Sequence, residues 1–500
     1  MRTFSKSKLL AYRQCPKRLW LEIHHPELRA DSSATQKSFQ VGHKVGEIAQ
    51  KLYDPKGKGQ IIDAQKEGFA TAFARTTELL ASSHPIFEAG FKAGGALAFA
   101  DVMLPKRKAG QRTWRMVEVK SSTSVKDYHR DDAAIQAFVA RAAGVPLSSI
   151  VLAHIDSQWV YPGGGDYEGL LVEEDLTKEA FSREQEVKVW IAEAQTIAAK
   201  RKEPKVCTGG QCSDPYECGF FDYCQGQEVQ AAYPVQWLPR IQSQALKLHI
   251  QDGAVIDMCD VPDELLNDRQ QRVKTHTLEG TTYFDGQSAA ATLADHKLPA
   301  YFLDFETIQF AVPIWKGTRP YQQIPFQFSL HRLGRTGKLE QKSFLDLSGS
   351  DPSMAFAEAL IAACGDRGPV FVYNAGFETA RIRELSDRFH KLKKPLLAIN
   401  ARVVDLLPIA QQHYYHPSQQ GSWSIKKVLP AIAPELSYGD LAGVQDGGMA
   451  MEAFLEAIAK ETTTSRKAEI EKQLLDYCSL DTYAMVKLWQ FFSGGIDLKI

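Results

Sequence analysis

The sequence predicts an α/β protein built from more than one domain. Its 500 residues exceed the size of one ordinary domain, and about two to four domains are typical of this length. Residues 298–500 alternate strand-like and helix-like patterns, which is typical of an α/β layer. The 44% hydrophobic and 24% charged residues match the composition of a globular protein.

The chain divides into three predicted regions. Residues 1–227 begin with helical patterns, continue through a strand-rich centre and end in a group of cysteines. Residues 228–297 form a predicted helical connector, because their short helical patterns are interrupted by prolines. In the last region, 298–500, we predict strands at 300–306, 326–334, 342–347 and 369–374, and helices at 352–364 and 468–492.

Hydropathy and charge argue against a membrane protein and against a generally basic one. No apolar run is long enough to span a membrane, and the first twenty residues lack the apolar core of a signal peptide. We therefore expect a cytoplasmic protein without a membrane partner. The net charge is −1, so any nucleic-acid binding must come from local basic patches.

Four of the eight cysteines lie close together, at Cys207, Cys212, Cys218 and Cys224. In a reducing cytoplasm such a group more often holds metal than disulfides. The last three are separated by five residues each, which is wider than the short knuckles of most structural zinc sites. This spacing disfavours zinc and leaves an iron–sulfur cluster open, with buried or reactive thiols as the alternative.

Two carboxylates interrupt an otherwise apolar strand pattern in YFLDFETIQF, residues 301–310. Asp304 and Glu306 point to the same face of a strand, about 7 Å apart along it. Like charges held this close are unfavourable unless a cation lies between them, and carboxylate oxygens suit Mg²⁺ or Mn²⁺. The alternative is an exposed strand end with two solvated acids.

Two later stretches add polar residues that could join this acid pair. In VFVYNAGFETARIREL, an apolar strand ends at Asn374 and Glu378 follows in a helical pattern. In LLDYCSLDTYAMVKLW, Tyr477 and Asp481 are four residues apart and share one face of a helix. Asp405 also lies in an apolar run, but no neighbour in sequence completes a site around it, and we interpret it as structural.

These three stretches resemble the motifs of the DEDD exonucleases, a group with a ribonuclease-H-like fold. In that family four carboxylates hold two divalent metal ions, and the tyrosine orients the attacking water. The resemblance implies metal ligands and a water-positioning residue, which are Asp304, Glu306, Glu378 and Asp481 with Tyr477. The second motif usually carries Asp where this chain has Glu378, which is longer by one C–C bond of about 1.5 Å.

The N-terminal region contains a second candidate site. GALAFADVMLP and TWRMVEVKSST, residues 95–105 and 113–123, are predicted strands joined by a basic turn. Glu118 and Lys120 face the same side of the second strand, and Asp101 ends the apolar run of the first. An Asp and a Glu can bind a divalent ion, and a lysine beside them can activate water or steady a phosphate. The alternative is an ordinary exposed strand.

This region resembles the RecB-like branch of the PD-(D/E)XK nucleases. Asp101, Glu118 and Lys120 match the core motif, and Gln136 matches the glutamine on the helix that follows. The family often has a histidine at the position of Gly46, and His43 and Glu47 on the same helical face are candidates to replace it or are simply solvated.

One early cysteine followed by three late ones resembles the [4Fe–4S] clasp of CRISPR-associated and helicase-linked RecB-like exonucleases. The resemblance implies four ligands, namely Cys15, Cys212, Cys218 and Cys224, and leaves Cys207 spare. A cluster of this kind ties the two ends of the nuclease domain together.

The stretch KRKAGQRTWR, residues 106–115, lies between the two N-terminal strands and carries five basic residues and Trp114. It is typical of a phosphate-binding loop with one stacking ring, or of a solubilising hairpin tip.

Together these features resemble a bacterial family that fuses a RecB-like nuclease to a ribonuclease-H-like exonuclease. The expected function is metal-dependent cleavage of nucleic acid, DNA rather than RNA, in repair or defence against foreign DNA. Two alternatives stay open, in which only one site is active and the other domain binds nucleic acid, or both sites are degenerate in an iron–sulfur adaptor protein.

Overall fold

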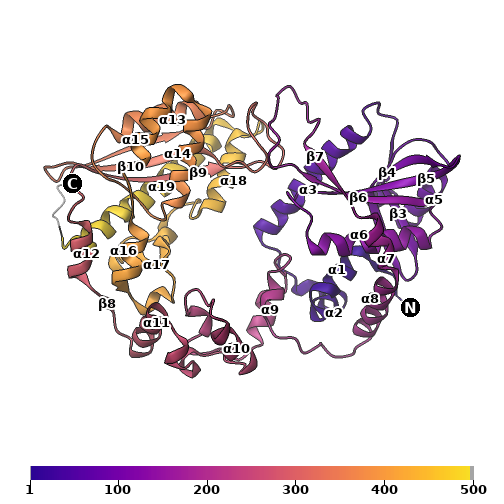
Figure 1. The fold of residues 1–500 in the computed structure, drawn as a ribbon, viewed down its shortest axis with the longest axis horizontal. Helices are drawn as coiled ribbons and strands as arrows, with labels where there is room; N and C mark the ends of the chain where they lie inside the picture. The colour runs from indigo at the N-terminus through magenta and orange to yellow at the C-terminus, as the bar shows by residue number, and fades with distance from the viewer. Residues whose placement is uncertain (1, 496–500) are drawn as a thin grey trace. The chain divides into compact units, whose positions relative to one another are not determined.

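The computed structural model describes residues 2–495, apart from the side chains of residues 33 and 34. The chain forms two compact units. The first comprises Met1–Glu228 and Phe310–Tyr321, and the second comprises Val229–Gln309 and Gln322–Ile500. Each contains mixed sheets and helices, which confirms the predicted α/β class (Figure 1). No helix among the described residues has the length and apolarity needed to cross a bilayer.

The first unit is built on a seven-stranded mixed sheet in the order β2-β3-β4-β5-β6-β7, with β1 paired to β4. The ladder between β4 and β5 is antiparallel, whereas β5 and β6 run parallel. The strands are β1 (Phe4–Ser5), β2 (Gln60–Ile61), β3 (Ile86–Ala93), β4 (Ala96–Lys108), β5 (Gln111–Lys120), β6 (Leu147–Ile155) and β7 (Leu171–Asp175).

Helices cover both faces of this sheet because its strands carry apolar side chains on both sides. Trp114 and Met116 of β5 belong to the core formed with helices α1, α6 and α8. Val117, which points to the opposite face, packs in a separate core that includes Tyr53 of α3. The helices are α1 (Lys6–Gln14), α2 (Pro16–His24), α3 (Ser33–Tyr53), α4 (Ala64–Glu67), α5 (Phe69–Leu79), α6 (Asp127–Ala142), α7 (Thr177–Ser182), α8 (Glu184–Ala198) and α9 (Phe221–Gly226).

The segment Phe310–Tyr321 belongs to the first unit, although the sequence places it inside the predicted C-terminal region. Ala311 and Val312 are buried with Val45 and Ile48 of α3. Main-chain hydrogen bonds from Tyr161 to Thr318 and from Gly317 to Tyr161 fix the segment against the loop after β6. Sequence periodicity does not reveal this contact, since its partners are more than a hundred residues away.

The second unit contains a five-stranded sheet in the order β11-β10-β9-β12-β13. β9, β12 and β13 run parallel, and β10 and β11 continue the sheet in antiparallel fashion. The strands are β9 (Ala300–Ile308), β10 (Ile324–Leu333), β11 (Leu339–Leu345), β12 (Val370–Val372) and β13 (Val403–Asp405). Four of them overlap the predicted strands.

Alternation along β9 separates two cores. Tyr301, Leu303 and Phe305 pack against helices α13, α14 and α15, whereas Phe302 packs against α16, α17 and α19 on the other face. Asp304 and Glu306 follow Phe302 on that second face. The helices are α13 (Ser353–Cys364), α14 (Gly376–Arg388), α15 (Lys393–Asn400), α16 (Leu406–His413), α17 (Ile425–Ile432), α18 (Gly447–Ile458) and α19 (Thr464–Phe492).

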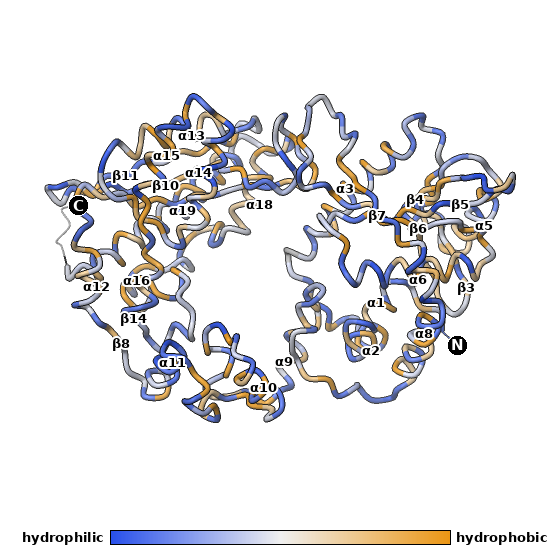
Figure 2. Tube along the Cα trace, viewed as in Figure 1, coloured by the Kyte–Doolittle hydropathy of each residue, from blue (hydrophilic) through white to orange (hydrophobic). Residues whose placement is uncertain are grey.

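The predicted connector 228–297 folds with the second unit. Its helices are α10 (Gln244–Asp252), α11 (Asp268–Glu279) and α12 (Gly286–Leu293). Strand β8 (Tyr283–Phe284) pairs with β14 (Tyr414–Tyr415), and α12 lies beside α16 (Figure 1). The connector contributes Val273, Ala289 and Leu293 to the core of the second unit. Along the trace of each unit, hydrophobic and hydrophilic residues alternate (Figure 2).

Candidate functional sites

The N-terminal candidate site lies where β4 and β5 separate. Their ladder ends at the pair Val102–Val117. Beyond it, the main-chain N–H of Val119 donates to Oδ2 of Asp101 at 2.7 Å. Opposite Asp101 on β3, Glu88 has a positive φ of 55°, and the β3–β4 ladder skips this position. This local irregularity directs the Asp101 and Glu88 carboxyl groups into a common space.

Glu118 and Lys120 of β5 meet a network that extends to two helices. The Lys120 Nζ lies 2.7 Å from Glu118 Oε1 and 2.6 Å from Asp132 Oδ2. Lys6 of α1 lies 2.8 Å from the same Glu118 oxygen and 3.0 Å from Asp132. Gln136 of α6 donates to the other Glu118 oxygen and to Asp132. The structure therefore brings together Glu118, Lys120 and Gln136 as predicted, with Lys6 and Asp132 added.

The charges in this network shift one another's pKa values. Burial raises the pKa of Asp101 well above its usual range, and the nearby Glu118 carboxylate adds to the effect. Burial likewise raises the pKa of Glu88 to about 7. Burial opposes the charged forms of Lys6 and Lys120, but the Asp132 and Glu118 carboxylates outweigh it, so the pKa of both lysines is raised. Both lysines therefore stay cationic at neutral pH.

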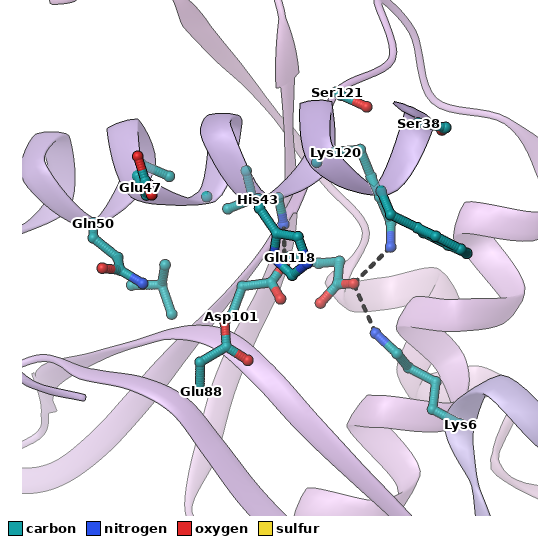
Figure 3. A pocket seen from close by; sticks show the side chains of 16 residues that line it. Lys6, Ser38, His43, Glu47, Gln50, Glu88, Asp101, Glu118, Lys120 and Ser121 are labelled. Atoms are coloured by element: carbon teal, nitrogen blue, oxygen red, sulfur yellow. Dashed lines mark hydrogen bonds and ion pairs between the residues drawn. The ribbon is translucent and has the colours of Figure 1, made fainter. Parts of the chain in front are cut away.

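A cavity of about 600 Å³ opens onto these carboxylates beneath α3. His43 extends from α3 toward Asp101 and Glu118 (Figure 3). Glu47 also lines the cavity but pairs with Lys44 at 3.2 Å. A Cβ atom added at Gly46 would have no neighbour within 4 Å, so a side chain here would have room. Both candidates from this helix thus line the cavity, and of the two Glu47 is held in an ion pair with Lys44.

The basic stretch 106–115 is a hairpin rather than a loop. β4 and β5 extend to Lys108 and Gln111, and the turn consists of Ala109 and Gly110, both with positive φ. The proposed stacking role of Trp114 is wrong, because this ring is fully buried in the core beneath the sheet. The alternation of β5 explains the error, since Trp114 shares the inward face with Met116.

The C-terminal candidate site is a compact group of carboxylates. Asp304 and Glu306 come from the centre of β9, and Asp481 comes from α19, which packs on that face of the sheet. One oxygen from each of these three side chains lies within 4.8 Å of the other two. Glu306 and Asp481 are buried, so the group is not a solvated strand end. A carboxylate set of this kind fits a hard divalent cation such as Mg²⁺.

Glu378, in the first turn of α14, is not one of the three acids that meet within 4.8 Å, but its charge helps to raise the pKa of Asp304 and of Glu306. It is 3% exposed, and its Oε2 has no hydrogen-bond partner among the described residues. Asp405 is near enough for its charge to raise the pKa of Glu378, and it accepts hydrogen bonds from the main-chain N–H groups of Asn374, Ala375 and Leu407. Asp405 therefore holds the turn after β12, as its predicted structural role requires. The unpartnered Glu378 oxygen is a buried acceptor that a cation would satisfy.

Two tyrosines and one lysine surround the acid group. Tyr438 donates a 2.6 Å hydrogen bond to Oδ1 of Asp481. The Lys426 Nζ lies 5.1 Å from the ring centroids of both Tyr438 and Tyr477. Tyr477 is buried one helical turn before Asp481, on the same face of α19. The predicted Tyr477–Asp481 pair is thus present, and Tyr438 is an additional residue that the sequence did not single out.

Mutual repulsion and burial leave the acids partly protonated in the absence of metal. Burial, reinforced by the Asp481 charge, raises the pKa of Glu306 to about 8. Burial also raises the pKa of Glu378 to about 7 and of Asp481 to about 6, although the Tyr438 hydrogen bond opposes the second shift. For Asp304 the pKa is raised well above its usual range by burial and by Asp481. Such a site gains affinity for a cation as protons leave.

The cysteines predicted as cluster ligands line one small cavity. It lies between the start of α2 and α9, and its walls include Cys15, Cys212, Cys218 and Cys224. Cys207, the predicted spare residue, lines the same cavity but is exposed. Burial raises the pKa of Cys218, and that of Cys224 to about 11, so these thiols are neutral without a metal. Among the described residues, no three of these sulfurs lie within 4.8 Å of one another, so the cysteines share a cavity wall without forming a compact ligand group.

Sequence reasoning missed Lys6, Glu88, Asp132 and Tyr438. A signal existed for Asp132, which precedes Gln136 by one helical turn and therefore shares its face. Lys6, Glu88 and Tyr438 carry no comparable local pattern, because only the packing of α1, the irregularity in β3 and the loop before α18 bring them to their sites.

Comparisons with known proteins cover part of the chain. A family described as "Domain of unknown function (DUF2779)" matches residues 301–424, which include Asp304, Glu306 and Glu378 but not Asp481. The uncharacterized protein MG366 homolog of Mycoplasma pneumoniae is 27% identical over 218 residues, covering 40% of this chain. The match spans 33% of that relative's own length. Neither description names an activity.

Proposed function

We propose that this protein is a metal-dependent nuclease with two candidate sites, one in each unit. The expected reaction is hydrolysis of phosphodiester bonds, with DNA as the substrate and repair or defence as the setting. The observation that carries the proposal is the Asp304–Glu306–Asp481 group, whose oxygens lie within 4.8 Å of one another. The buried Glu378 carboxylate, one oxygen of which has no hydrogen-bond partner among the described residues, acts electrostatically on Asp304 and Glu306. Three of these four acids are buried and Asp304 is half-buried. Placing them together is unfavourable, and a bound cation is the simplest compensation.

In the C-terminal site, Asp304, Glu306, Glu378 and Asp481 would hold Mg²⁺ or Mn²⁺. Two such ions would supply charge stabilisation for the attacking and leaving oxygens of the phosphodiester. Tyr438 orients the Asp481 carboxylate through its hydrogen bond. Tyr477 is placed to orient water, and Lys426 supplies the cation that offsets the acid charge and can face a phosphate.

In the N-terminal site, Asp101 and Glu118 would hold the metal ion, and Lys120 would steady the phosphate or the attacking water. Lys6 and Lys120 share one Glu118 oxygen, and Gln136 occupies the other. Because both Glu118 oxygens already have partners, a second candidate function is favoured, in which only the C-terminal site cleaves and the first unit binds nucleic acid. Asp101 accepts a main-chain hydrogen bond and, like Glu88, lines the cavity.

For the cysteine-lined cavity we propose a [4Fe–4S] cluster ligated by Cys15, Cys212, Cys218 and Cys224. What supports it is that all four line one cavity although Cys15 is separated from the others by almost the whole first unit. A bound cluster would link the start of α2 to α9, and so join the N-terminal and C-terminal parts of the first unit.

A nuclease assay on end-labelled single and double strands with Mg²⁺ or Mn²⁺ tests the proposal. Asp101→Ala and Asp304→Asn should each remove one metal-dependent activity, and Asp304→Asn should remove digestion from free 3′ ends. The exposed acids Glu184 and Asp387 provide matched controls as Glu184→Gln and Asp387→Asn, which should cleave like the parent. Undiminished cleavage by the Asp101→Ala, Asp304→Asn double variant would overturn the assignment of both sites.

A further inference from the structure

A basic pocket lies at the edge of the second unit's sheet where the parallel strands begin. β9, β12 and β13 start at Ala300, Val370 and Val403, and antiparallel β10 ends at Leu333 beside them. The segments that flank these strand ends enclose a cavity of about 550 Å³. The residues that matter here, which define the basic pocket, are Lys297, Arg335, Arg367 and Arg402.

This pocket is separate from the acid group. Asp304 lies four residues along β9 from Ala300, which corresponds to about 13 Å at the usual rise of a strand. Glu378 likewise follows the end of β12, whereas Arg367 precedes its start. The basic pocket therefore lies where these strands begin, whereas the carboxylates lie at the centre of β9 and beyond the end of β12.

The positive charge of the pocket is not neutralised locally. Four cationic side chains line it against one carboxylate, Asp295. Arg367 pairs with Asp366 at 3.4 Å, but both are exposed. Within residues 2–495, Lys297, Arg335 and Arg402 form no ion pair. In a protein of net charge −1, this is a local concentration of positive charge.

Main-chain contacts hold the basic side chains in place without cancelling their charge. The Arg402 guanidinium donates to the carbonyl oxygens of Gly365 and Gly368, each at 2.9 Å. Gly368 has a φ of 94°, and a Cβ atom there would lie 2.0 Å from the Pro299 carbonyl oxygen, so position 368 in the pocket wall requires glycine. Arg335 donates through Nε to Leu298 at 3.2 Å. Its terminal amino groups have no acceptor in the described chain and could form a bidentate contact with an oxyanion.

We propose that the basic pocket binds a phosphate group. The source is either the backbone of a nucleic-acid strand or a free nucleotide, since both present the same oxyanion. Arg335 and Lys297 would contact the phosphate, and Arg402 would support the pocket wall and contribute long-range charge. The inference requires no activity at either acid site, so it can hold or fail independently of the proposed nuclease function.

Binding to the full-length protein in EDTA tests this proposal without any cleavage. The variant is Arg335→Gln with Lys297→Gln, both exposed positions. The matched control is Lys338→Gln, an exposed lysine in the same turn that pairs with Glu340. The probes are a fluorescent single-stranded oligonucleotide, measured by anisotropy over a range of salt concentrations, and pyrophosphate, measured by its effect on the melting temperature.

If a strand is the ligand, the double variant should bind the oligonucleotide several-fold more weakly than the parent. Its slope of log affinity against log salt should fall by about 0.7 for each lost phosphate contact. If a free nucleotide is the source, pyrophosphate should raise the melting temperature of the parent and the control, but not of the double variant. A double variant that matches Lys338→Gln with both probes would overturn the proposal. Lys297→Glu alone repeats the test should the double variant fold poorly.

Discussion

Tyr321 donates its phenolic hydrogen bond to the main-chain carbonyl oxygen of Ser121, 200 residues earlier in the chain. Ser121 directly follows Lys120, a residue of the N-terminal candidate site. The segment that ends in Tyr321 also buries Ala311 and Val312 against α3, the helix that lines the cavity of that site. A fragment cut at residue 227 would lack this segment, and one starting at residue 298 would expose it. Experiments on either site therefore require the whole chain.

Tyr321→Phe should lower both the stability of the first unit and its metal-dependent cleavage. Removing the hydroxyl costs about 1 kcal/mol of unfolding free energy and frees the main chain next to Lys120. Tyr12→Phe is the control, since it removes a tyrosine hydrogen bond to Glu193 away from the cavity. Urea unfolding should show that both variants are less stable than the parent. Cleavage rates should fall in Tyr321→Phe and stay unchanged in Tyr12→Phe. Equal cleavage by the two variants would contradict a positioning role for Tyr321.

Asp132→Asn should destabilise the protein strongly, because two half-buried lysines lose the buried carboxylate that they share. Breaking a buried ion pair by removing one partner costs about 3–5 kcal/mol. The urea midpoint should fall well below that of the parent, whereas Glu184→Gln, which removes an exposed partner of Lys188, should leave it unchanged. A second change, Lys6→Met, should recover part of the loss, since it removes one of the two lysines that would then share the single Glu118 carboxylate. Absence of any recovery would argue against the network as described.

Mg²⁺ should raise the melting temperature of the Asp101→Ala protein through the C-terminal acid group. A cation at a hundred times its dissociation constant stabilises the folded state by about 2.7 kcal/mol. Asp304→Asn and Glu378→Gln, added separately to this background, should each abolish the rise. Asp387→Asn, a surface change in the same unit, should retain it. A rise that survives loss of Asp304 would place the metal elsewhere.

The metal-free protein should lose stability as the pH rises from about 5 to 8. The pKa of Glu306 is about 8 in the folded state against an ordinary value of 4.5. The folded protein therefore binds the proton more tightly than the unfolded chain, and deprotonation at higher pH favours unfolding. Burial and the acids that face Glu306, which are Asp481, Asp446 and Glu378, raise this pKa, and Lys426 opposes them.

Urea unfolding in EDTA between pH 5 and 8 measures this dependence. Glu306→Gln should flatten the curve relative to the parent, and adding Mg²⁺ should offset the parent's loss at pH 8. Parallel curves for parent and variant would show that Glu306 is not the titrating group.

Protein purified without oxygen should be brown and contain iron and sulfide. Serine at Cys15, Cys212, Cys218 or Cys224 should remove the colour and reduce the soluble yield, because the proposed cluster would link distant parts of the first unit. Cys207→Ser should have much less effect, and Cys259→Ser, an exposed cysteine outside the cavity, should have none. Stoichiometric zinc without iron would contradict the iron–sulfur assignment.

Local patterns were sufficient for much of the second unit. The alternation in β9 placed Asp304 and Glu306 on one face, and the four-residue spacing placed Tyr477 and Asp481 on one face of α19. The α/β class and the strands near 300, 326, 342 and 369 followed from the same periodicities. These features depend on residues a few positions apart, so the sequence expresses them directly.

Other features arise only when distant elements pack. The sequence alone suggested a stacking Trp114, but the inward face of β5 buries it. The structure assigns Phe310–Tyr321 to the first unit, joins Lys6 and Asp132 to Glu118, and sets Tyr438 against Asp481. Such contacts depend on which faces of separate helices and strands exclude water together, and no local spacing encodes that choice. The sequence thus determined which residue types each element presents, and tertiary packing decided which of them meet.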